Sequence, residues 1–234
     1  MRVNSEISAP APCTPSADWG AIFDWDGVII DSSKAHEESW ERLALETGHT
    51  LPPDHFIKGF GRKNDFIIPE LLGWTRDPQE ITRLSLRKEE LYRDVVRDRG
   101  QTALPGVRVW LERLKAGGVP CVVGSSTHRA NIELILDLVG LREFFAAIVS
   151  AEDVSHGKPD PEVFLKAAGK IGRLPERCVV FEDAHVGIAA ARAAGMKVVG
   201  VATTHPVEEL SETDRAVRRL DELTVDLLAG WFAG

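Results

Sequence analysis

Two carboxylates two residues apart, Asp24 and Asp26, directly follow a short apolar run at residues 21–23 and precede Gly27. In an extended segment, residues i and i+2 point the same way, so we expect both carboxylates to face one ligand. Close carboxylates repel each other and attract a hard divalent cation. The pattern therefore favours metal-assisted chemistry, with an Asx-type turn after a strand as the alternative.

A second acidic pair, Glu182 and Asp183, ends another apolar run at residues 177–181. Taken alone, this pair could cap the next helix, where carboxylates favour the helix dipole. Taken with the first pair, it supplies further oxygen ligands for Mg²⁺, which prefers few carboxylates together with water and phosphate oxygens. The two acidic pairs together therefore predict phosphoryl chemistry.

Two further segments fit the same site. Ser125, Ser126 and Thr127 follow a strand-like run and precede a helical one, where hydroxyls and backbone N–H groups can hold phosphate. Lys158 lies between a glycine and a proline, in a loop stiff enough to aim its ammonium group. The alternatives are a simple helix cap at Ser126 or Thr127 and an ordinary surface charge at Lys158.

The composition excludes several classes of protein. The 234 residues include 28 Lys+Arg and 36 Asp+Glu, a net charge of −8, so we expect no nucleic-acid partner and no binding to anionic membranes. Three cysteines without a CxxC pair, one of them Cys13, support neither disulfides nor zinc. No run is apolar enough for a membrane span and residues 1–18 do not resemble a secretory signal, so we expect a cytoplasmic monomer.

The chain after about residue 103 alternates β-branched runs with amphipathic stretches, as in repeated βαβ units. The expected strands are residues 119–124, 147–150, 177–181 and 197–201, with residues 21–23 as a fifth. Helical spacing is present in two sets of apolar residues: Val107, Trp110, Leu111 and Leu114, and Ile132, Ile135, Leu136 and Val139. The pattern predicts an α/β fold with a Rossmann-like parallel sheet and a covering helix at residues 220–232.

Residues 33–100 carry almost no strand signal and three helical ones. The first begins at Ser33 as a cap and ends at Gly48, the second covers residues 64–72, and the third covers residues 77–99. We therefore expect a flexible tail at residues 1–17, an α/β core at 18–32 and 101–234, and an inserted helical cap at 33–100.

Four motifs occur in order between residue 20 and about residue 205: DWDGVIIDS, GSSTHRAN, GKPDPEVF and FEDAHVGIAAARAAGM. In these motifs the sequence resembles the haloacid dehalogenase superfamily, within it the group of β-phosphoglucomutase and related sugar-phosphate phosphatases. That group inserts a helical cap after the first motif. The dehalogenases of the superfamily work without a metal, and the two acidic pairs argue against that branch.

The resemblance implies a role for each acidic residue. Asp24 would be the nucleophile that forms an aspartyl-phosphate, and Asp26 the general acid and base. Mg²⁺ would be bound by Asp24, the backbone carbonyl of Asp26 and Asp183, with Glu182 in or next to its coordination shell. Ser125, the Ser126 backbone and Lys158 would hold the phosphate oxygens.

The same resemblance implies substrate contacts in the cap. Residues 58–62 resemble a specificity loop in which Lys58, Gly61 and Arg62 meet the sugar and a distal anionic group. His36 matches a histidine at the cap hinge, with a partly buried helix residue as the alternative. At the rim of the core, His128 and Arg129 replace the mutase's residues, which is a departure from the mutase pattern.

We therefore expect a Mg²⁺-dependent phosphatase of a small phosphorylated metabolite, such as a sugar phosphate. A phosphomutase of hexose 1-phosphates would use nearly all the same residues. Pyrophosphate hydrolysis is a third possibility, if Arg62 holds a second phosphoryl group. From a different class, the same fold could serve as a catalytically silent binding module. The presence of every residue at the catalytic positions argues against that last alternative.

Overall fold

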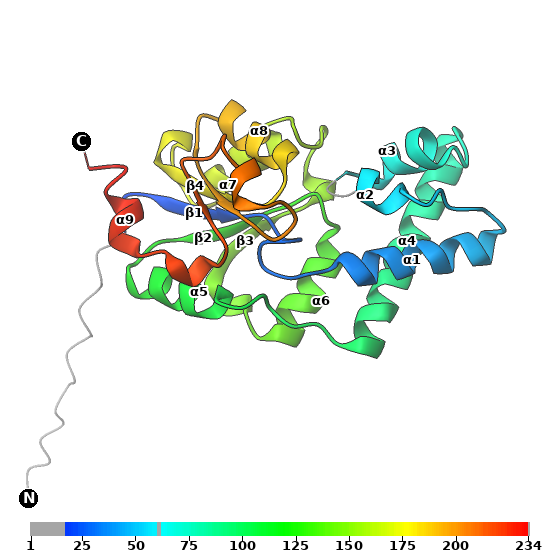
Figure 1. The fold of residues 1–234 in the computed structure, drawn as a ribbon, viewed down its shortest axis with the longest axis horizontal. Helices are drawn as coiled ribbons and strands as arrows, with labels where there is room; N and C mark the ends of the chain where they lie inside the picture. Colours follow the sequence, from blue (N-terminus) through cyan, green and yellow to red (C-terminus); the bar gives the residue numbers. More distant parts are fainter. Residues whose placement is uncertain (1–16, 60–61, 234) are drawn as a thin grey trace, which may run out of the picture.

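The computed structural model describes residues 17–59 and 62–233. Its centre is a six-stranded sheet in which every neighbouring pair is parallel, in the order β3-β2-β1-β4-β5-β6 (Figure 1). The strands are β1 (Gly20–Phe23), β2 (Cys121–Gly124), β3 (Phe145–Val149), β4 (Cys178–Glu182), β5 (Lys197–Val201) and β6 (Arg215–Val217). This sheet confirms the predicted α/β class, although β6 was not predicted.

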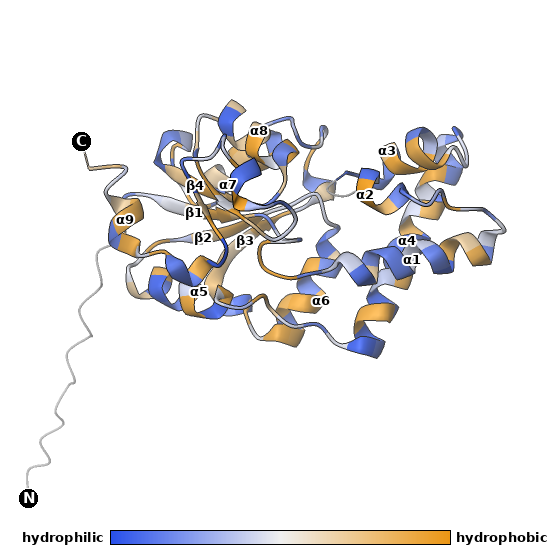
Figure 2. Ribbon diagram, in the orientation of Figure 1, coloured by the Kyte–Doolittle hydropathy of each residue, from blue (hydrophilic) through white to orange (hydrophobic). Residues whose placement is uncertain are grey.

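Both faces of the sheet are apolar, and helices cover each of them. In β1, Phe23 faces one hydrophobic cluster and Ile22 faces another, as alternation along a strand requires. The first cluster includes residues of α5 (Val107–Ala116), α6 (Arg129–Val139) and α9 (Val225–Ala229). The second includes residues of α7 (Glu162–Lys170) and α8 (His185–Ala193). Figure 2 shows hydrophobic strands between helices of mixed character.

Residues 33–100, called the helical insert below, form a separate group of helices. These are α1 (Ser33–Thr47), α2 (His55–Gly59), α3 (Asn64–Phe66), a π-helical turn (Ile67–Leu72) and α4 (Pro78–Arg99). They share a small core of their own around Trp40, Leu43 and Ile68. In Figure 1 the insert lies beside the sheet, at the end opposite the described chain ends.

The helix boundaries follow local signals only in part. Asp77 caps α4, since its carboxylate accepts a hydrogen bond from the Gln79 N–H at 3.1 Å. Gly48 ends α1 in the left-handed conformation, at φ 69°, as its sequence position predicts. The prediction of Ser33 as a cap was wrong, because Ser33 is the first residue of α1 and Ser32 precedes the helix without a capping side-chain bond.

The C-terminal segment also differs from its prediction. Instead of one helix over residues 220–232, the chain forms a 3₁₀ turn (Leu220–Glu222) and then α9. Other 3₁₀ turns are Arg142–Phe144, Ala151–Asp153, Pro175–Arg177 and Val207–Glu209. The break has a local reason: the hydroxyl of Thr224 accepts from the Leu227 N–H at 3.3 Å and starts α9 afresh.

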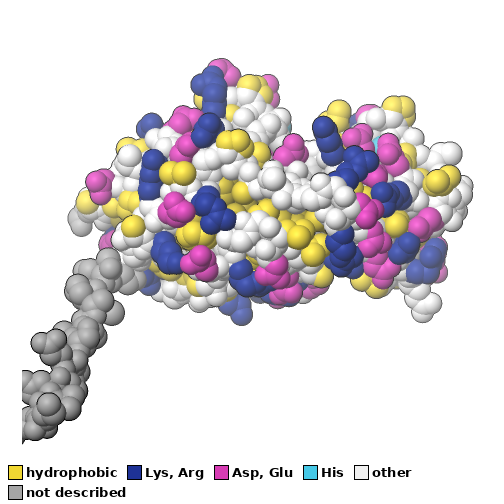
Figure 3. Space-filling model, turned by 90° about the horizontal axis from the view of Figure 1, so that it is seen from below, with side chains coloured by type: hydrophobic (Ala, Val, Ile, Leu, Met, Phe, Trp, Pro, Cys, Tyr) yellow, Lys and Arg dark blue, Asp and Glu magenta, His cyan; other side chains and the backbone are white. Residues whose placement is uncertain are grey.

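Surface charges of both signs are mixed. On the face drawn in Figure 3, Lys and Arg side chains alternate with Asp and Glu side chains over both the sheet-bearing part and the helical insert. Over the described part of the chain, no helix is both long enough and apolar enough to span a bilayer. The expected tail at 1–17, apart from Ala17, and Cys13 lie outside the described residues.

Candidate active site

The sheet order brings the motifs together at one edge. Because β1 lies between β2 and β4, the residues that follow these strands are neighbours at their carboxyl ends, where α/β proteins bind ligands. Phe23 is level with Val123 on one side and with Phe181 on the other. Asp24 continues from β1, and its N–H donates to the Phe181 carbonyl at 3.0 Å.

Three buried carboxylates converge at this edge: Asp24, Glu182 and Asp183. One oxygen from each carboxylate lies within 4.8 Å of one oxygen from each of the other two. The side chain of Lys158 enters the same cluster, with its Nζ 2.7 Å from Asp24 Oδ1 and 2.6 Å from Glu182 Oε1. Although burial favours the neutral amine, the charges of Asp24 and Glu182 hold the pKa of Lys158 above its ordinary value. Lys158 is therefore a fixed cation inside the cluster.

Two glycines make room for the carboxylates. At Gly27, whose φ is +79°, a Cβ would lie 1.9 Å from Asp183 Oδ2. At Gly187 a Cβ would lie 1.6 Å from Glu182 Oε1. The other oxygen of Glu182 accepts from the N–H groups of Asp183 and Ala184, both at 2.8 Å. Any larger residue at these two positions would displace a carboxylate.

The cluster carries more negative charge than Lys158 balances. Burial raises the pKa of Asp24 to about 7, with Glu182 and Asp26 adding to the effect and Lys158 opposing it. Burial and the charges of Glu182 and Asp24 also raise the pKa of Asp183 well above its ordinary value. A divalent cation would relieve this repulsion, and an all-oxygen donor set suits Mg²⁺. The residues present therefore fit a magnesium ion.

Asp26 lies beside this cluster with its carboxylate held by the core and the insert. Its two oxygens accept hydrogen bonds from the hydroxyls of Ser32 and Thr127. His36 Nε2 lies 3.7 Å from Oδ1. Although burial acts in the opposite direction, the His36 contact and the two hydroxyls hold the pKa of Asp26 below its ordinary value. Asp26 is thus an anchored anion, and Thr127 does not cap a helix.

Ser125, Ser126 and Thr127 all line one cavity with the carboxylates. The Ser125 hydroxyl accepts from the Thr127 N–H at 3.1 Å, which fixes the turn between β2 and α6. His128 precedes α6 without a side-chain cap, so neither Ser126 nor Thr127 is the capping residue. The turn therefore places Ser125 and Ser126 on the cavity that Asp24 also lines, while the Thr127 hydroxyl donates to Asp26.

The cavity has a volume of about 290 Å³ and lies between the core and the helical insert. Its core wall carries the carboxylates, Lys158 and the serine turn. Its insert wall combines apolar side chains such as Trp40 and Ile67 with polar ones such as Ser85. A site of this size and mixed lining suits one small ligand.

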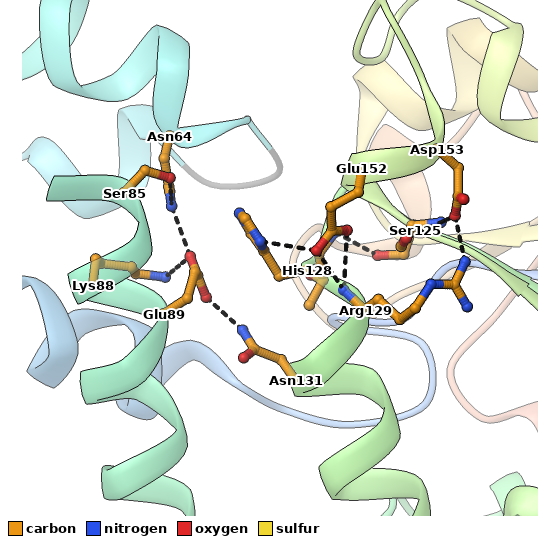
Figure 4. Close-up of polar contacts among 12 residues, drawn as sticks. Asn64, Ser85, Lys88, Glu89, Ser125, His128, Arg129, Asn131, Glu152 and Asp153 are labelled. Carbon is orange, nitrogen blue, oxygen red and sulfur yellow. Dashed lines mark hydrogen bonds and ion pairs between the residues drawn. The ribbon is translucent and has the colours of Figure 1, made fainter. Parts of the chain in front are cut away.

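A buried polar network on the insert wall was not predicted from the sequence. The Glu89 carboxylate of α4 accepts from Asn64 Nδ2 at 2.7 Å, from Lys88 Nζ at 3.0 Å and from the Asn131 amide of α6 (Figure 4). Arg93 Nη1 donates to Asn131 Oδ1 at 2.9 Å. Asn131 therefore joins the insert to the core. Two adjacent charged residues in an amphipathic helix, such as Lys88 and Glu89 in α4, are usually exposed to solvent. The sequence pattern of α4 therefore did not predict the buried network.

His36 lies between this network and Asp26. Its ring stacks on Tyr92, with centroids 4.2 Å apart, and its Nδ1 lies 2.6 Å from Lys88 Nζ. Because an ammonium group can only donate, His36 Nδ1 accepts and Nε2–H faces Asp26. This half-buried histidine therefore connects the insert to the expected acid and base.

The remaining insert residues are placed differently from one another. Arg62 lines the cavity, with its guanidinium carbon 4.5 Å from the centre of the Phe66 ring. Lys58 belongs to α2, is exposed, pairs with Asp54 and does not line the cavity. Gly61 lies outside the described residues. Of the two described residues, Arg62 lies at the site and Lys58 does not.

The two rim residues of the core also differ. His128 lines the cavity, and its Nδ1 lies 3.0 Å from Glu152 Oε1 (Figure 4). Arg129 turns away: its Nη2 lies 2.5 Å from Asp153 Oδ2 and donates to the Ile148 carbonyl at 3.0 Å. Arg129 thus contacts β3 and the 3₁₀ turn that follows it, and it does not line the cavity.

Comparison with known proteins agrees with this geometry. A family model described as haloacid dehalogenase-like hydrolase matches residues 20–195. The chain is 39% identical over 214 residues to the chloroplastic 5-amino-6-(5-phospho-D-ribitylamino)uracil phosphatase of Arabidopsis thaliana, covering 88% of this chain but only 56% of that protein. It is 36% identical over 182 residues to the fructose-1-phosphate phosphatase of Escherichia coli, covering 78% of this chain and 95% of that one.

A solved structure of this family has a similar fold. The β-phosphoglucomutase of Clostridium difficile superposes with a TM-score of 0.80 at 25% identity, over 92% of this chain and 97% of that one. The family match includes all four carboxylates of the two acidic pairs.

Proposed function

The chain belongs to the haloacid dehalogenase-like hydrolases and is an enzyme that acts on phosphate esters, and we propose that it is a magnesium-dependent phosphatase of a small phosphorylated metabolite. The observation that carries this proposal is the position of Asp24. Asp24 directly follows β1, its carboxylate contacts Lys158, and it lines the cavity together with Ser125. A bound phosphate would thus meet a nucleophile and a cation at once.

In the first step, an oxygen of Asp24 attacks phosphorus, and the bond from phosphorus to the leaving oxygen breaks. A carboxylate is already anionic and needs no base for this attack. Lys158 and the Ser125–Ser126 turn hold the phosphate oxygens while charge develops on them. Asp26 gives its proton to the leaving oxygen, and contact with an anionic substrate favours the protonated form of Asp26.

In the second step, Asp26 takes a proton from the water that attacks the aspartyl-phosphate. The bond between phosphorus and the Asp24 oxygen then breaks, which releases phosphate and restores the carboxylate. The anchored anion seen in this structure suits this base role, because Ser32, Thr127 and His36 already orient it. A magnesium ion held by Asp24 and Asp183, with the Asp26 backbone carbonyl and Glu182 near it, would offset charge between nucleophile and phosphate.

We propose that residues 33–100 act as a cap over a core formed by residues 18–32 and 101–234. The cavity lies between these two parts, and Asn131 and Glu89 connect them. The polar groups of the insert wall, among them Ser85 and Asn64, suit the hydroxyls of a sugar phosphate. The relative from Escherichia coli, a fructose-1-phosphate phosphatase, supports that substrate class.

The test is phosphate release over a panel of sugar phosphates, hexitol phosphates and pyrophosphate, with and without Mg²⁺. We expect turnover of at least one phosphate ester that requires Mg²⁺ and disappears in Asp24→Asn. Asp31→Asn, an exposed residue of the same loop, is the matched control. Turnover that survives in Asp24→Asn would overturn the proposal.

A phosphomutase remains the second candidate, favoured by the likeness to β-phosphoglucomutase. The two activities differ in what reaches the aspartyl-phosphate, water or a sugar hydroxyl. Supplying β-glucose 1-phosphate with glucose 1,6-bisphosphate separates them, because a mutase forms glucose 6-phosphate without net release of inorganic phosphate, whereas a phosphatase releases one inorganic phosphate for every ester bond that it cleaves.

A further inference from the structure

A second group of metal-ligating side chains lies outside the cavity. It consists of His185, His205 and Glu209, whose ligand atoms all lie within 4.8 Å of one another. His185 is the first residue of α8, His205 follows β5, and Glu209 ends a 3₁₀ turn. The sequence separates these residues, and the fold brings them together at the carboxyl edge of the sheet.

The ring of His205 is oriented by a contact with the backbone of Asp183. Its Nδ1 lies 3.0 Å from the Asp183 carbonyl oxygen and 3.0 Å from the Thr204 hydroxyl. Because the carbonyl can only accept, the tautomer that satisfies it carries the proton on Nδ1 and leaves a lone pair on Nε2. Histidines that bind metal commonly donate their other ring N–H to a carbonyl or carboxylate in this way. The ring of His185 lies 4.5 Å from that of His205, measured between centroids.

The other two ligands are not committed elsewhere. Over residues 17–59 and 62–233, neither the His185 ring nor the Glu209 carboxylate forms a hydrogen bond or ion pair. Both are exposed, so both can adjust and an ion can reach them from solvent. Two imidazoles and one carboxylate suit borderline ions such as Zn²⁺, Co²⁺ and Ni²⁺, whereas the all-carboxylate cluster at Asp24 suits Mg²⁺.

We propose that His185, His205 and Glu209 bind one transition-metal ion of the Zn²⁺ class, at a site separate from the magnesium site. Asp183 belongs to the magnesium site and also contacts the histidine site. Its carbonyl holds His205, and the Thr204 hydroxyl lies 2.8 Å from its Oδ2. An ion at the histidine site would link the start of α8 to the loop after β5. It would also fix His205, which contacts the Asp183 carbonyl.

The test is titration of the full chain with Zn²⁺ against a chromophoric chelator, in saturating Mg²⁺ so that the carboxylate cluster is occupied. We expect one competing Zn²⁺ per chain in the wild type and binding at least tenfold weaker in His185→Ala and Glu209→Gln. Neither residue touches the cavity, so both variants should keep Mg²⁺-dependent turnover, which shows that they are folded. His156→Ala, an exposed histidine beside Glu162, is the control and should bind as the wild type does.

Co²⁺ provides a second measurement. Two imidazole ligands should give the wild type a visible absorption band that His185→Ala lacks and His156→Ala keeps. Equal Zn²⁺ affinity in wild type and His185→Ala would overturn the proposal, as would a Co²⁺ band that is unchanged by that substitution. These readouts do not depend on which phosphate ester the enzyme hydrolyses.

Discussion

Lys158 Nζ lies 2.7 Å from Asp24 Oδ1, although the two residues are 134 positions apart in the sequence. The side chain of Lys158 is only 4% exposed, so its charge acts in a largely water-free place. This contact connects the loop at Gly157–Pro159 to the proposed nucleophile.

Replacing this ammonium should remove transition-state stabilisation. In Lys158→Met we expect kcat to fall by roughly 10²- to 10³-fold, as when one charge-stabilising donor is lost from an active site. Phosphate release under saturating substrate measures the effect. Lys170→Met, at the exposed end of α7, should leave kcat unchanged, and an equal loss in both variants would contradict the assignment.

Magnesium should stabilise the protein more at pH 8 than at pH 5.5. Without metal, burial raises the pKa of Asp24 from 3.8 to about 7, so the stability that its protonated form contributes is lost as pH rises through about 7. At pH 5.5 the ion must displace this proton, whereas at pH 8 it need not. The measurement is Tm with Mg²⁺ or with EDTA at both pH values; a gain independent of pH would disagree.

The glycine at position 187 should be required for metal affinity. An alanine there would meet Glu182 Oε1 and force that carboxylate to move. We expect Gly187→Ala to bind Mg²⁺ roughly 10- to 100-fold more weakly, the usual cost of disturbing groups around a metal. Calorimetric titration with Mg²⁺ measures this. Gly169→Ala, on a helix with open space around the position, should bind normally.

Because of the Glu89 network, the free energy of unfolding should fall as the pH falls below 4.5. Although burial opposes the shift, Lys88, the nearby histidines and Asn64 lower the pKa of Glu89 from 4.5 to about 2, which corresponds to roughly 3 kcal/mol of stability. This contribution is present above pH 4.5 and lost as pH falls through about 2.

Glu89→Gln should therefore lower the free energy of unfolding at pH 7 by roughly 3 kcal/mol, and the difference from wild type should shrink below pH 4.5. Urea unfolding at several pH values measures it. Glu90→Gln, the exposed neighbour that pairs with Arg87, should have little effect at any pH. Similar losses for both substitutions would show that burial of Glu89 does not matter.

Arg62 should affect substrate binding more than chemistry. It lines the insert wall of the cavity and makes no contact with the carboxylate cluster among the described residues. We expect Arg62→Met to raise KM about tenfold with little change in kcat, the pattern of an interaction made equally in ground and transition states. Arg76→Met, exposed on the same insert, is the control. A fall in kcat at unchanged KM would assign Arg62 a different role.

The sequence predicts best where a residue follows a strand. The positions of Asp24, Ser125 and Asp183 follow from where hydrophobic runs end, and the parallel sheet then brings them together. Contacts between distant surfaces have no such local signal. Asn131 lies on an amphipathic helix like any other polar residue, and only tertiary structure shows that it meets Glu89 of the insert. Lys58 illustrates the converse, since a motif placed it near the substrate and its helix turns it toward Asp54.

The central position of β1 has a consequence for how the chain is made. Of the six described strands, β1 is synthesised first, yet Ile22 pairs with Val122 and Val180, so its neighbours emerge from the ribosome much later. The insert has its own core around Trp40 and Leu43, so it can collapse before the strands that pair with β1 have been synthesised. Pairings so distant along the chain are slow to form. During synthesis, the segment that carries the proposed nucleophile, Asp24, is therefore among the last to reach its final position.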